Sequence, residues 1–327
     1  MNDLHQSWRS RVGASAESIV VPGFVDIHIH GGFGIDFMSA SAAEIRTWCD
    51  NLREQGYECF LPTTVTASSD AVRKALTQLP EHEMIAGFHL EGPFISSKYP
   101  GAQPQDAIAS PLDRNAWKDI LSDPRLKVIT IAGEIPGALN LIAELSERGV
   151  IVSLGHTNAT FAECERAYQA GARHTTHTYN AMRPLHHRES GSVGFALLND
   201  DVRCELIYDR IHVCKEAAQV LLKAKPADGV IAISDATMAA GMDPGSKATM
   251  WGMDVLVGEK EVRLTDGTLA GSAITLLDAF RNLAEDVGLE TAVRACCLNP
   301  RKALNLEDIR LLVEFDSTLQ VRALHRV

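Results

Sequence analysis

The sequence predicts an α/β fold, a (β/α)8 TIM barrel with a small, reduced β-sandwich appendage formed by the two chain ends. Three observations support this prediction. Strand-like and helix-like segments alternate, the candidate strands number eight, and polar residues follow the C-terminal ends of several strands. A doubly wound open sheet would gather such residues at one switch point instead. We place the barrel at residues 22–305 and the appendage at residues 1–21 and 306–327.

The candidate strands are short apolar runs that are rich in β-branched residues, as expected for strands buried on both faces. The first of them is entered through Pro22-Gly23 and left through Gly31-Gly32. In chain order the eight predicted strands are 19–29, 59–66, 84–90, 127–132, 150–155, 173–178, 202–207 and 229–234.

Helical periodicity fills the intervals between these strands. A glycine at positions 56, 149 and 171 follows three of the helical stretches, where a left-handed helix stop is favoured. The least regular connection is 179–201, where we expect only a short helix. The predicted helices are 42–55, 69–79, 113–121, 138–148, 160–170 and 215–225.

The chain continues well beyond the eighth strand. Residues 251–264 read as a hairpin that turns near Gly258 and crosses the barrel mouth. Residues 272–286 and 289–297 look helical. The tail 309–323 alternates like a strand pair, so it is assigned to the appendage and not to the barrel.

Composition excludes several classes of function. The net charge of −11 argues against a general nucleic-acid binder, although a local basic pocket could still take an anionic small molecule. No apolar run is long enough for a membrane span, and the polar start of the chain has no signal core. Seven cysteines without a Cys-x-x-Cys pair indicate a reducing compartment. We therefore expect a cytoplasmic protein that binds neither membrane nor nucleic acid.

Potential metal ligands occur at the ends of five predicted strands. Side chains alternate along a strand, so the two histidines of the first strand share one face. Neutral imidazole and carboxylate ligands suit Zn²⁺, with Fe²⁺, Co²⁺ or Mn²⁺ as alternatives, and one or two ions per subunit. The candidate ligands are His28, His30, Glu91, His156, His177 and Asp235.

Each of these residues also has a purely structural interpretation. Glu91 precedes Gly-Pro and could sit at a helix N-terminus. His156 and His177 could be core histidines, and Asp235 could be an N-cap. These interpretations would all have to hold together, at the same end of different strands, so the metal site explains the set better.

Seven motifs now carry a specific resemblance. The chain resembles the amino-sugar-phosphate deacetylases of the amidohydrolase superfamily, chiefly the N-acetylglucosamine-6-phosphate deacetylase family. The His-x-His pair and the aspartate are common to the superfamily, whereas the Leu-Glu-Gly-Pro and Asn-Ala-Met motifs point to the deacetylases. The motifs are PGFVDIHIHGG (22–32), HLEGPF (89–94), GHTNAT (155–160), HTYNAM (177–182), HRESG (187–191), SDAT (234–237) and LAGS (269–272).

The resemblance implies a role for most of the candidate residues. It implies that Glu91, His156 and His177 are the principal metal ligands and that His28 and His30 form a second-metal pair, which some members of the family lack. Asp235 matches the general base and acid, and a metal ligand. Three further residues match substrate-binding positions of the family. His212 matches a substrate-binding histidine, and Asn180 and Ala181 match a contact with the phosphate.

Arg188 matches an arginine that reaches the phosphate of the neighbouring subunit's substrate, so the resemblance implies a homodimer. A planar guanidinium suits phosphate, although an ion pair with Glu189 is the structural alternative. Ala102 and Gln103 match positions near the sugar, but the family usually has histidine where this chain has Gln103. Arg210 stands where the family usually has glycine.

The implied reaction is hydrolysis of the acetamide of an N-acetylhexosamine 6-phosphate, most often N-acetyl-D-glucosamine 6-phosphate, to the amino sugar 6-phosphate and acetate in amino-sugar catabolism. A stable amide needs a polarised carbonyl and an activated water, which a divalent ion with an adjacent aspartate supplies. The alternatives are deacetylation of N-acetylgalactosamine 6-phosphate, another amidohydrolase reaction such as cyclic-amide hydrolysis or deamination, and an inactive barrel kept for binding.

Overall fold

The computed structural model describes residues 2–327, with side chains from His5 onward, so Met1 of the predicted appendage lies outside the described residues. The centre of the fold is the predicted barrel. An eight-stranded parallel sheet has the order β11-β10-β9-β8-β7-β6-β5-β2. Its strands are β2 (Phe24–Ile29), β5 (Tyr57–Thr64), β6 (Phe88–Glu91), β7 (Leu126–Ile131), β8 (Ile151–Leu154), β9 (His174–Thr175), β10 (Arg203–Ile207) and β11 (Val230–Ile233).

The barrel closes just past the end of β11. The N–H of Asp235 donates to the carbonyl of His28 at 3.0 Å, and the N–H of His30 donates to that of Ala236 at 2.8 Å. Closure therefore joins the first strand to the residues that follow the last one. Because His28, His30 and Asp235 lie on this seam, the fold itself brings these predicted ligands together.

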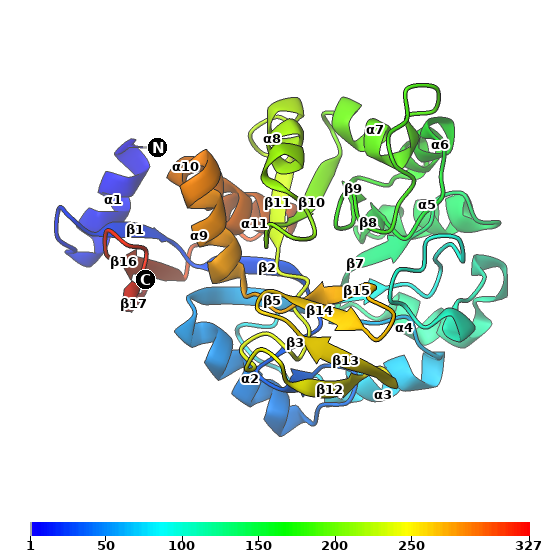
Figure 1. Cartoon of the computed structure of the whole chain (residues 1–327), viewed down its shortest axis with the longest axis horizontal. Coiled ribbons are helices and arrows are strands. Elements are labelled where there is room, and N and C mark those ends of the chain that lie inside the picture. The colour runs from blue at the N-terminus through cyan, green and yellow to red at the C-terminus, as the bar shows by residue number, and fades with distance from the viewer. Residues whose placement is uncertain (1) are drawn as a thin grey trace.

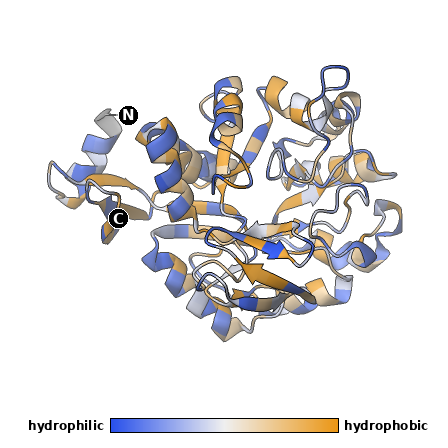
Figure 2. Cartoon of the chain, viewed as in Figure 1, coloured by the Kyte–Doolittle hydropathy of each residue, from blue (hydrophilic) through white to orange (hydrophobic). Residues whose placement is uncertain are grey.

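Helices surround the sheet (Figure 1). Apolar side chains fill both the barrel interior and the layer between strands and helices. Helices such as α8 carry hydrophilic and hydrophobic residues together, as expected for helices with one face on the sheet (Figure 2). The surrounding helices are α2 (Ala42–Glu54), α3 (Ser69–Gln78), α4 (Lys118–Ser122), α5 (Ala138–Glu147), α6 (Phe161–Ala170), α7 (Gly191–Leu198), α8 (Lys215–Ala224) and α9 (Leu276–Val287).

Helix starts follow local capping chemistry. Ser41 and Thr160 accept a hydrogen bond from the backbone N–H three residues on, and the carboxylates of Glu44 and Glu163 accept one from the backbone N–H of the cap residue. Thr275 and Asp278 form the same capping box at α9. The helix predicted from residue 272 therefore starts only at Leu276, because residues 269–272 pair as a strand.

The predicted first strand, 19–29, is in fact two strands. β1 (Ile19–Pro22) pairs antiparallel with β16 (Leu311–Phe315), whereas β2 pairs parallel with β5. The chain passes between the two sheets at Gly23, where a Cβ atom would lie 2.8 Å from the Cβ of Glu58. A glycine is required at this crossing because any side chain would collide with the barrel.

The predicted β appendage is present at one side of the barrel (Figure 1). It is a three-stranded sheet of order β1-β16-β17, in which β17 spans Val321–Arg326. Helix α1 (Asn2–Val12), which the sequence did not predict, packs Trp8 against it. The strand pair predicted for the tail is confirmed, with its turn beginning at Asp316.

The predicted hairpin over the barrel mouth is also confirmed, within a larger antiparallel sheet. Its order is β12-β13-β14-β15. The strands are β12 (Lys247–Met250), β13 (Met253–Val257), β14 (Glu261–Leu264) and β15 (Leu269–Ser272). The short pair β3 (Gly31–Gly32) and β4 (Ile35–Asp36) lies beside the end of β2.

Some predicted elements were too long or of the wrong type. The strand predicted at 84–90 begins only at Phe88, and the one at 173–178 shortens to His174–Thr175, because the backbone turns into positive φ at His177 and Tyr179. The helix predicted at 113–121 begins as a 3-10 turn (Asn115–Trp117) and becomes α-helical only in α4, and two further 3-10 turns precede it (Gln105–Ala107 and Pro111–Asp113). Residues 289–297 form α10 (Leu289–Val293) and a π-helical turn (Arg294–Leu298), followed by α11 (Asn299–Ala303).

Among the described residues, the structure contains no helix that is long and apolar enough to cross a membrane.

Candidate functional site

A cavity of about 250 Å³ opens at the C-terminal ends of the barrel strands. Residues predicted from the sequence make up most of its wall. They are His30, Glu91, Ala102, Gln103, His156, His177, Asn180, Ala181, His212 and Asp235. His28 lies beneath them and is fully buried, whereas Arg188 is exposed on the loop before α7.

The local backbone aims these side chains at one point. Glu91 is the last residue of β6, and three others follow β8, β9 and β11 with positive φ: His156 at 47°, His177 at 30° and Asp235 at 46°. Non-glycine residues adopt this conformation at a cost of about 1–3 kcal/mol each, and it is typical of functional sites.

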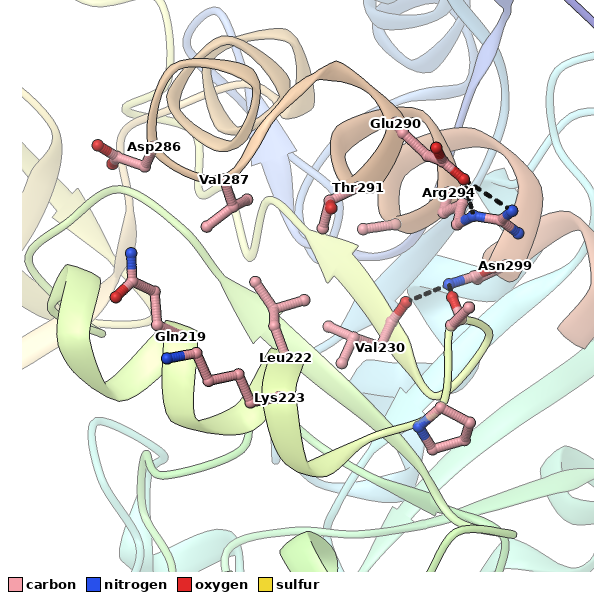
Figure 3. A pocket seen from close by; sticks show the side chains of 13 residues that line it. Gln219, Leu222, Lys223, Val230, Asp286, Val287, Glu290, Thr291, Arg294 and Asn299 are labelled. Atoms are coloured by element: carbon pink, nitrogen blue, oxygen red, sulfur yellow. Dashed lines mark hydrogen bonds and ion pairs between the residues drawn. The ribbon is translucent and has the colours of Figure 1, made fainter. Parts of the chain in front are cut away.

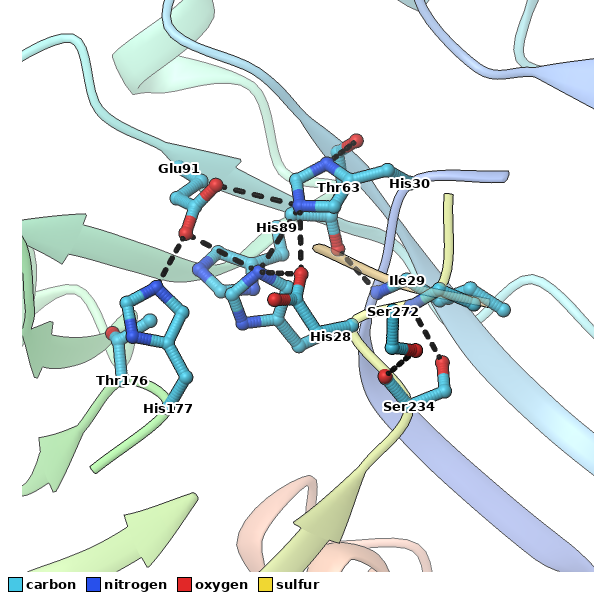
Figure 4. Close-up of polar contacts among 12 residues, drawn as sticks. His28, Ile29, His30, Thr63, His89, Glu91, Thr176, His177, Ser234 and Ser272 are labelled. Carbon is cyan, nitrogen blue, oxygen red and sulfur yellow. Dashed lines mark hydrogen bonds and ion pairs between the residues drawn. The ribbon is translucent and has the colours of Figure 1, made fainter. Parts of the chain in front are cut away.

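The tautomers of three histidines follow from their partners. Nδ1 of His30 is 3.1 Å from the carbonyl of Thr63 (Figure 4), and Nδ1 of His156 is 3.0 Å from that of Tyr99. Nδ1 of His177 is 3.2 Å from the carbonyl of Asn180. A carbonyl oxygen only accepts, so each Nδ1 carries the proton and each Nε2 presents a lone pair to the site.

The Nε2 atoms of four histidines converge on the Glu91 carboxylate in two groups. Figure 4 shows His28, His30 and His177 around Glu91. Oε1 of Glu91 lies 3.2 Å from Nε2 of His156 and 3.1 Å from Nε2 of His177. Oε2 lies 3.4 Å from Nε2 of His30, and Oε1 is 3.3 Å from Nε2 of His28. The groups His28-His30-Glu91 and Glu91-His156-His177 each have ligand atoms close enough for one ion, and both use Glu91.

The geometry fits a divalent cation. Nε2 of His156 and Nε2 of His177 are 3.0 Å apart, although the bonds at Nδ1 leave both with a lone pair. Two lone pairs at this distance repel each other unless a cation lies beside them. Nitrogen and carboxylate oxygen donors in this number suit zinc and similar ions.

Charge reinforces this conclusion. Burial raises the pKa of Glu91, but positive charge on His28 and the contacts of the carboxylate with His156, His177 and His28 outweigh burial, so the pKa is well below its usual range. Burial also lowers the pKa of His28, but Glu91 and Asp235 outweigh that effect and raise it well above its usual value. The negative potential that favours a proton on His28 equally favours a metal ion.

Asp235 faces the first of the two groups. Its Oδ1 lies 3.2 Å from Nε2 of His30 and 3.4 Å from Nε2 of His28. Burial raises the pKa of Asp235, yet positive charge on His28 and the contact with His30 outweigh burial and lower it. Its carboxylate is therefore ionised at neutral pH and able to accept a proton.

His212 is held by a residue that sequence reasoning missed. The carboxylate of buried Asp209 lies 2.5 Å from Nδ1 of His212 and also accepts the backbone N–H groups of Ile211 and His212 at 2.8 and 2.7 Å. Nε2 of His212 is thereby left for the cavity. The Asp-x-x-His spacing was the available signal.

Of the candidate phosphate residues, Asn180 and Ala181 lie together at the cavity wall, whereas exposed Arg188 lies apart from them. The N–H of Asn180 donates to the carbonyl of His177 at 2.9 Å within a turn, and Ala181 follows it with a φ of 47°. Nη1 of Arg188 is 2.7 Å from Nε2 of His187. The alternative partner Glu189 instead accepts the backbone N–H of Phe161 at 3.0 Å, which caps α6.

The two residues that depart from the family pattern, Gln103 and Arg210, form side-chain hydrogen bonds in the structure. The side-chain amide of Gln103 donates to Oε2 of Glu91 at 2.5 Å and accepts the N–H of Thr66 at 2.7 Å, so it fixes the central carboxylate. Arg210 adopts a φ of 70° and pairs with Asp286 at 2.6 Å, which ties the His212 loop to α9.

Trp251 is a further cavity residue that the sequence did not reveal as such. It lies in the turn between β12 and β13, and its ring centroid is 5.5 Å from that of His30. An aromatic residue in a flap has no distinctive spacing, so only the tertiary structure brings it to the metal ligands.

A larger cavity, of about 470 Å³, lies outside the barrel between α8 and α9–α10 (Figure 3). Two of its polar side chains have hydrogen-bond partners within the lining. Arg294 pairs with Glu290 at 2.9 Å, and the side-chain amide of Asn299 donates to the carbonyl of Val230 at 2.7 Å. The clustered titratable groups are at the barrel mouth, so we take the mouth as the functional site.

Comparison with known proteins agrees with this geometry. The sequence model of the amidohydrolase family matches residues 19–309. The N-acetylglucosamine-6-phosphate deacetylase of Lysinibacillus sphaericus is 39% identical over 306 residues, which cover 90% of this chain and 79% of that protein. The N-acetylgalactosamine-6-phosphate deacetylase of Escherichia coli O157:H7 is 33% identical over 302 residues, which cover 89% of this chain and 79% of that protein.

A solved structure of similar sequence has the same fold. The N-acetyl-D-glucosamine-6-phosphate deacetylase of Mycobacterium smegmatis, in a mutant form complexed with N-acetyl-D-glucosamine 6-phosphate, superposes with a TM-score of 0.89 at 32% identity. The match covers 94% of this chain and 86% of that one. The family and the His/Glu cluster together indicate a divalent metal centre. This chain is therefore a hydrolase acting on an amide and belongs to the amidohydrolase family, in the group of N-acetylglucosamine-6-phosphate deacetylases.

Proposed function

We propose that this chain hydrolyses the acetamide of N-acetyl-D-glucosamine 6-phosphate and releases acetate and the amino sugar 6-phosphate, in amino-sugar catabolism. Catalysis belongs to the barrel, residues 22–305. The observation that carries the proposal is the convergence of Nε2 of His156 and Nε2 of His177 on Oε1 of Glu91, within 3.2 Å, beside an ionised Asp235.

The proposed cofactor is Zn²⁺, with Fe²⁺, Co²⁺ or Mn²⁺ as alternatives. Glu91, His156 and His177 would hold one ion, and His28, His30 and Glu91, next to Asp235, would hold a second. A divalent ion supplies Lewis acidity, which polarises a carbonyl and makes water more acidic near pH 7. The carbonyl partners of the histidines keep their lone pairs directed at these positions.

The proton transfers fall to Asp235. Its carboxylate takes a proton from the attacking water and returns it to the amine nitrogen, which must leave protonated. Asp209 holds the ring of His212 through Nδ1, so that a proton on Nε2 can be donated to the acetamide oxygen, where negative charge develops. Both side chains line one 250 Å³ cavity, so a single bound acetamide can contact them together.

The phosphate is bound by Ala181 and Asn180, through backbone and side-chain groups at the cavity wall. Because Arg188 is exposed and does not point into its own cavity, we propose that it reaches the site of a neighbouring subunit in a homodimer. Ala102 and Gln103, which line the same cavity, contact the sugar. Gln103 also holds Glu91, so its amide serves two purposes.

The test compares acetate release from three compounds on one sample of measured metal content. They are N-acetylglucosamine 6-phosphate, N-acetylgalactosamine 6-phosphate and unphosphorylated N-acetylglucosamine. We expect the highest kcat/KM with the first and a large loss without the phosphate. Equal efficiency on the unphosphorylated sugar would overturn the proposal, because the phosphate contacts would then have no function.

A second candidate is the galactosamine epimer. It is favoured by Gln103, which replaces the family's usual histidine at the sugar, and by a relative that is named for that epimer. A higher kcat/KM for N-acetylgalactosamine 6-phosphate in the same assay would select this candidate.

A further inference from the structure

Glu205 is a buried carboxylate that no sequence pattern singled out. It lies in the middle of β10 and is 0% exposed. Neighbouring positions inside the barrel are apolar, such as Ile207, Ile231 and Ile233. Burying a carboxylate inside the barrel costs free energy unless a partner compensates its charge, whereas burying an apolar side chain at the same position does not.

The partner of Glu205 is His28. Oε2 of Glu205 lies 3.0 Å from Nδ1 of His28 and also 3.3 Å from the backbone N–H of His177. A backbone N–H only donates, so this oxygen is an acceptor and Nδ1 of His28 carries the proton. Among the described residues, the other oxygen, Oε1, has no hydrogen-bond partner.

His28 therefore differs from the other metal-facing histidines. Nδ1 of His30, His156 and His177 each meets a neutral backbone carbonyl, whereas Nδ1 of His28 meets a carboxylate. A carboxylate partner makes an imidazole a stronger ligand than a carbonyl partner does, and it fixes the ring orientation. The charge of Glu205 thus reaches the cation position through the His28 ring.

We propose that Glu205 is a positioning residue that fixes His28 for cation binding and thereby decides whether the His28-His30 group holds an ion in addition to the Glu91-His156-His177 group. The inference rests on the metal centre of the proposed function but not on the identity of the sugar. Loss of Glu205 should weaken cation binding at the His28-His30 group and leave binding at the Glu91-His156-His177 group unchanged. The reason is that Glu205 contacts the ring of His28 but only the backbone of His177.

The test measures bound metal in the full-length protein without substrate. Wild type, Glu205→Leu, Glu205→Gln and His28→Ala are stripped, titrated with Co²⁺, and assayed for ions per subunit and for the visible spectrum of each bound ion. We expect two ions in wild type. In Glu205→Leu we expect one tight ion and a second weakened about 10–100-fold. Glu205→Gln keeps an acceptor oxygen, so its affinity for the second ion should lie between those of wild type and Glu205→Leu.

A double variant separates positioning from general damage to the barrel. If Glu205 acts through His28, then Glu205→Leu combined with His28→Ala loses no more metal affinity than His28→Ala alone. Wild-type binding of both ions in folded Glu205→Leu, one ion in wild type, or additive losses in the double variant would each overturn the proposal. Should Glu205→Leu fail to fold, the Glu205→Gln spectrum decides, since an unchanged second-ion spectrum and affinity contradicts the proposal. Failure of sugar hydrolysis leaves these binding measurements intact.

Discussion

Replacing Asp235 by asparagine removes the proposed proton acceptor and little else. The backbone around Asp235 is held independently of its side chain. Its N–H donates to the carbonyl of His28 at 3.0 Å, and its carbonyl accepts the N–H of Ser272 at 2.8 Å. Asparagine has nearly the same shape and tolerates the positive φ of 46° better than most residues. The barrel seam should therefore stay closed in Asp235→Asn.

The size of the effect follows from the chemistry of the group. A positioned general base contributes about 10²–10⁴-fold to a rate. At about 1.4 kcal/mol per tenfold, this amounts to roughly 3–5 kcal/mol of transition-state stabilisation. We expect kcat to fall by this factor, and KM to change little, because His212 and Asn180 are untouched. The Glu91-His156-His177 ion should remain, since Oδ1 of Asp235 contacts only His28 and His30.

The assay follows acetate release at saturating substrate, with metal content measured on the same sample. Asp201→Asn, an exposed position that accepts a hydrogen bond from Tyr168, is the matched control and should behave as wild type. Undiminished turnover in Asp235→Asn at normal metal content would refute the assignment of the base. A loss of turnover that added metal fully restores would assign Asp235 to metal binding alone.

Four further predictions follow from other parts of the structure. His28→Ala with His30→Ala should halve the metal content and keep much of the turnover, because the second group is intact. Arg188→Ala should raise KM about 10–100-fold, the value of a charge-assisted contact, and mixing it with Asp235→Asn should restore activity in hybrid dimers. Glu58→Gln should cost about 3–5 kcal/mol of unfolding free energy, because it leaves the guanidinium of Arg301, 2.7 Å away, buried without its partner. His174→Phe should reduce the decrease in unfolding free energy that occurs as the pH falls below 7.

The acid prediction depends on the sign of one pKa shift. Burial, with a smaller contribution from Arg203, lowers the pKa of His174 to about 3. Below the unfolded value of about 6.5, the unfolded chain binds a proton that the folded chain does not. Stability is therefore complete above that pH and falls by about 1.4 kcal/mol per pH unit as the pH drops toward 3. Urea unfolding of wild type and His174→Phe between pH 7 and pH 4 gives the pH dependence of the unfolding free energy for each protein. The same pH dependence in both proteins would contradict the prediction.

Each grouped experiment has its own control. Total loss of metal in the double histidine variant would show that the two groups are not independent. Hybrid dimers that stay inactive would remove the support for an arginine shared between subunits. Arg310→Ala is the control for Glu58→Gln, because its pair with Glu58 is longer, at 3.4 Å, and half-exposed. An equal loss in both variants would contradict the special role of the buried pair.

Local patterns were sufficient for the barrel and for most of its mouth. Apolar runs separated by amphipathic stretches marked each barrel strand, and the ligand residues stood at strand ends where a parallel barrel collects them. The break at Gly23 was not predictable, since an apolar run of that length reads as one strand. Its cause is a steric contact with Glu58, which is distant in sequence.

The same distinction holds within the site. His28, His30, Glu91, His156, His177 and Asp235 were predicted because metal-binding residue types at strand ends are rare. Glu205, Asp209, Gln103 and Trp251 acquire their relation to the site through contacts: a carboxylate on His28, a carboxylate on His212, an amide on Glu91 and a ring beside His30.

The fold class, the family and the chemical type of the site can be read from the amino-acid sequence, because they depend on periodicity and on residue types at known positions. The tautomer of each histidine, the carboxylate that holds His28 and the closure of the barrel become visible only in three dimensions. Those features depend on distances of about 3 Å between residues far apart in the chain, such as the 3.0 Å contact of His28 with Glu205. A one-dimensional pattern records spacing along the chain and not such contacts.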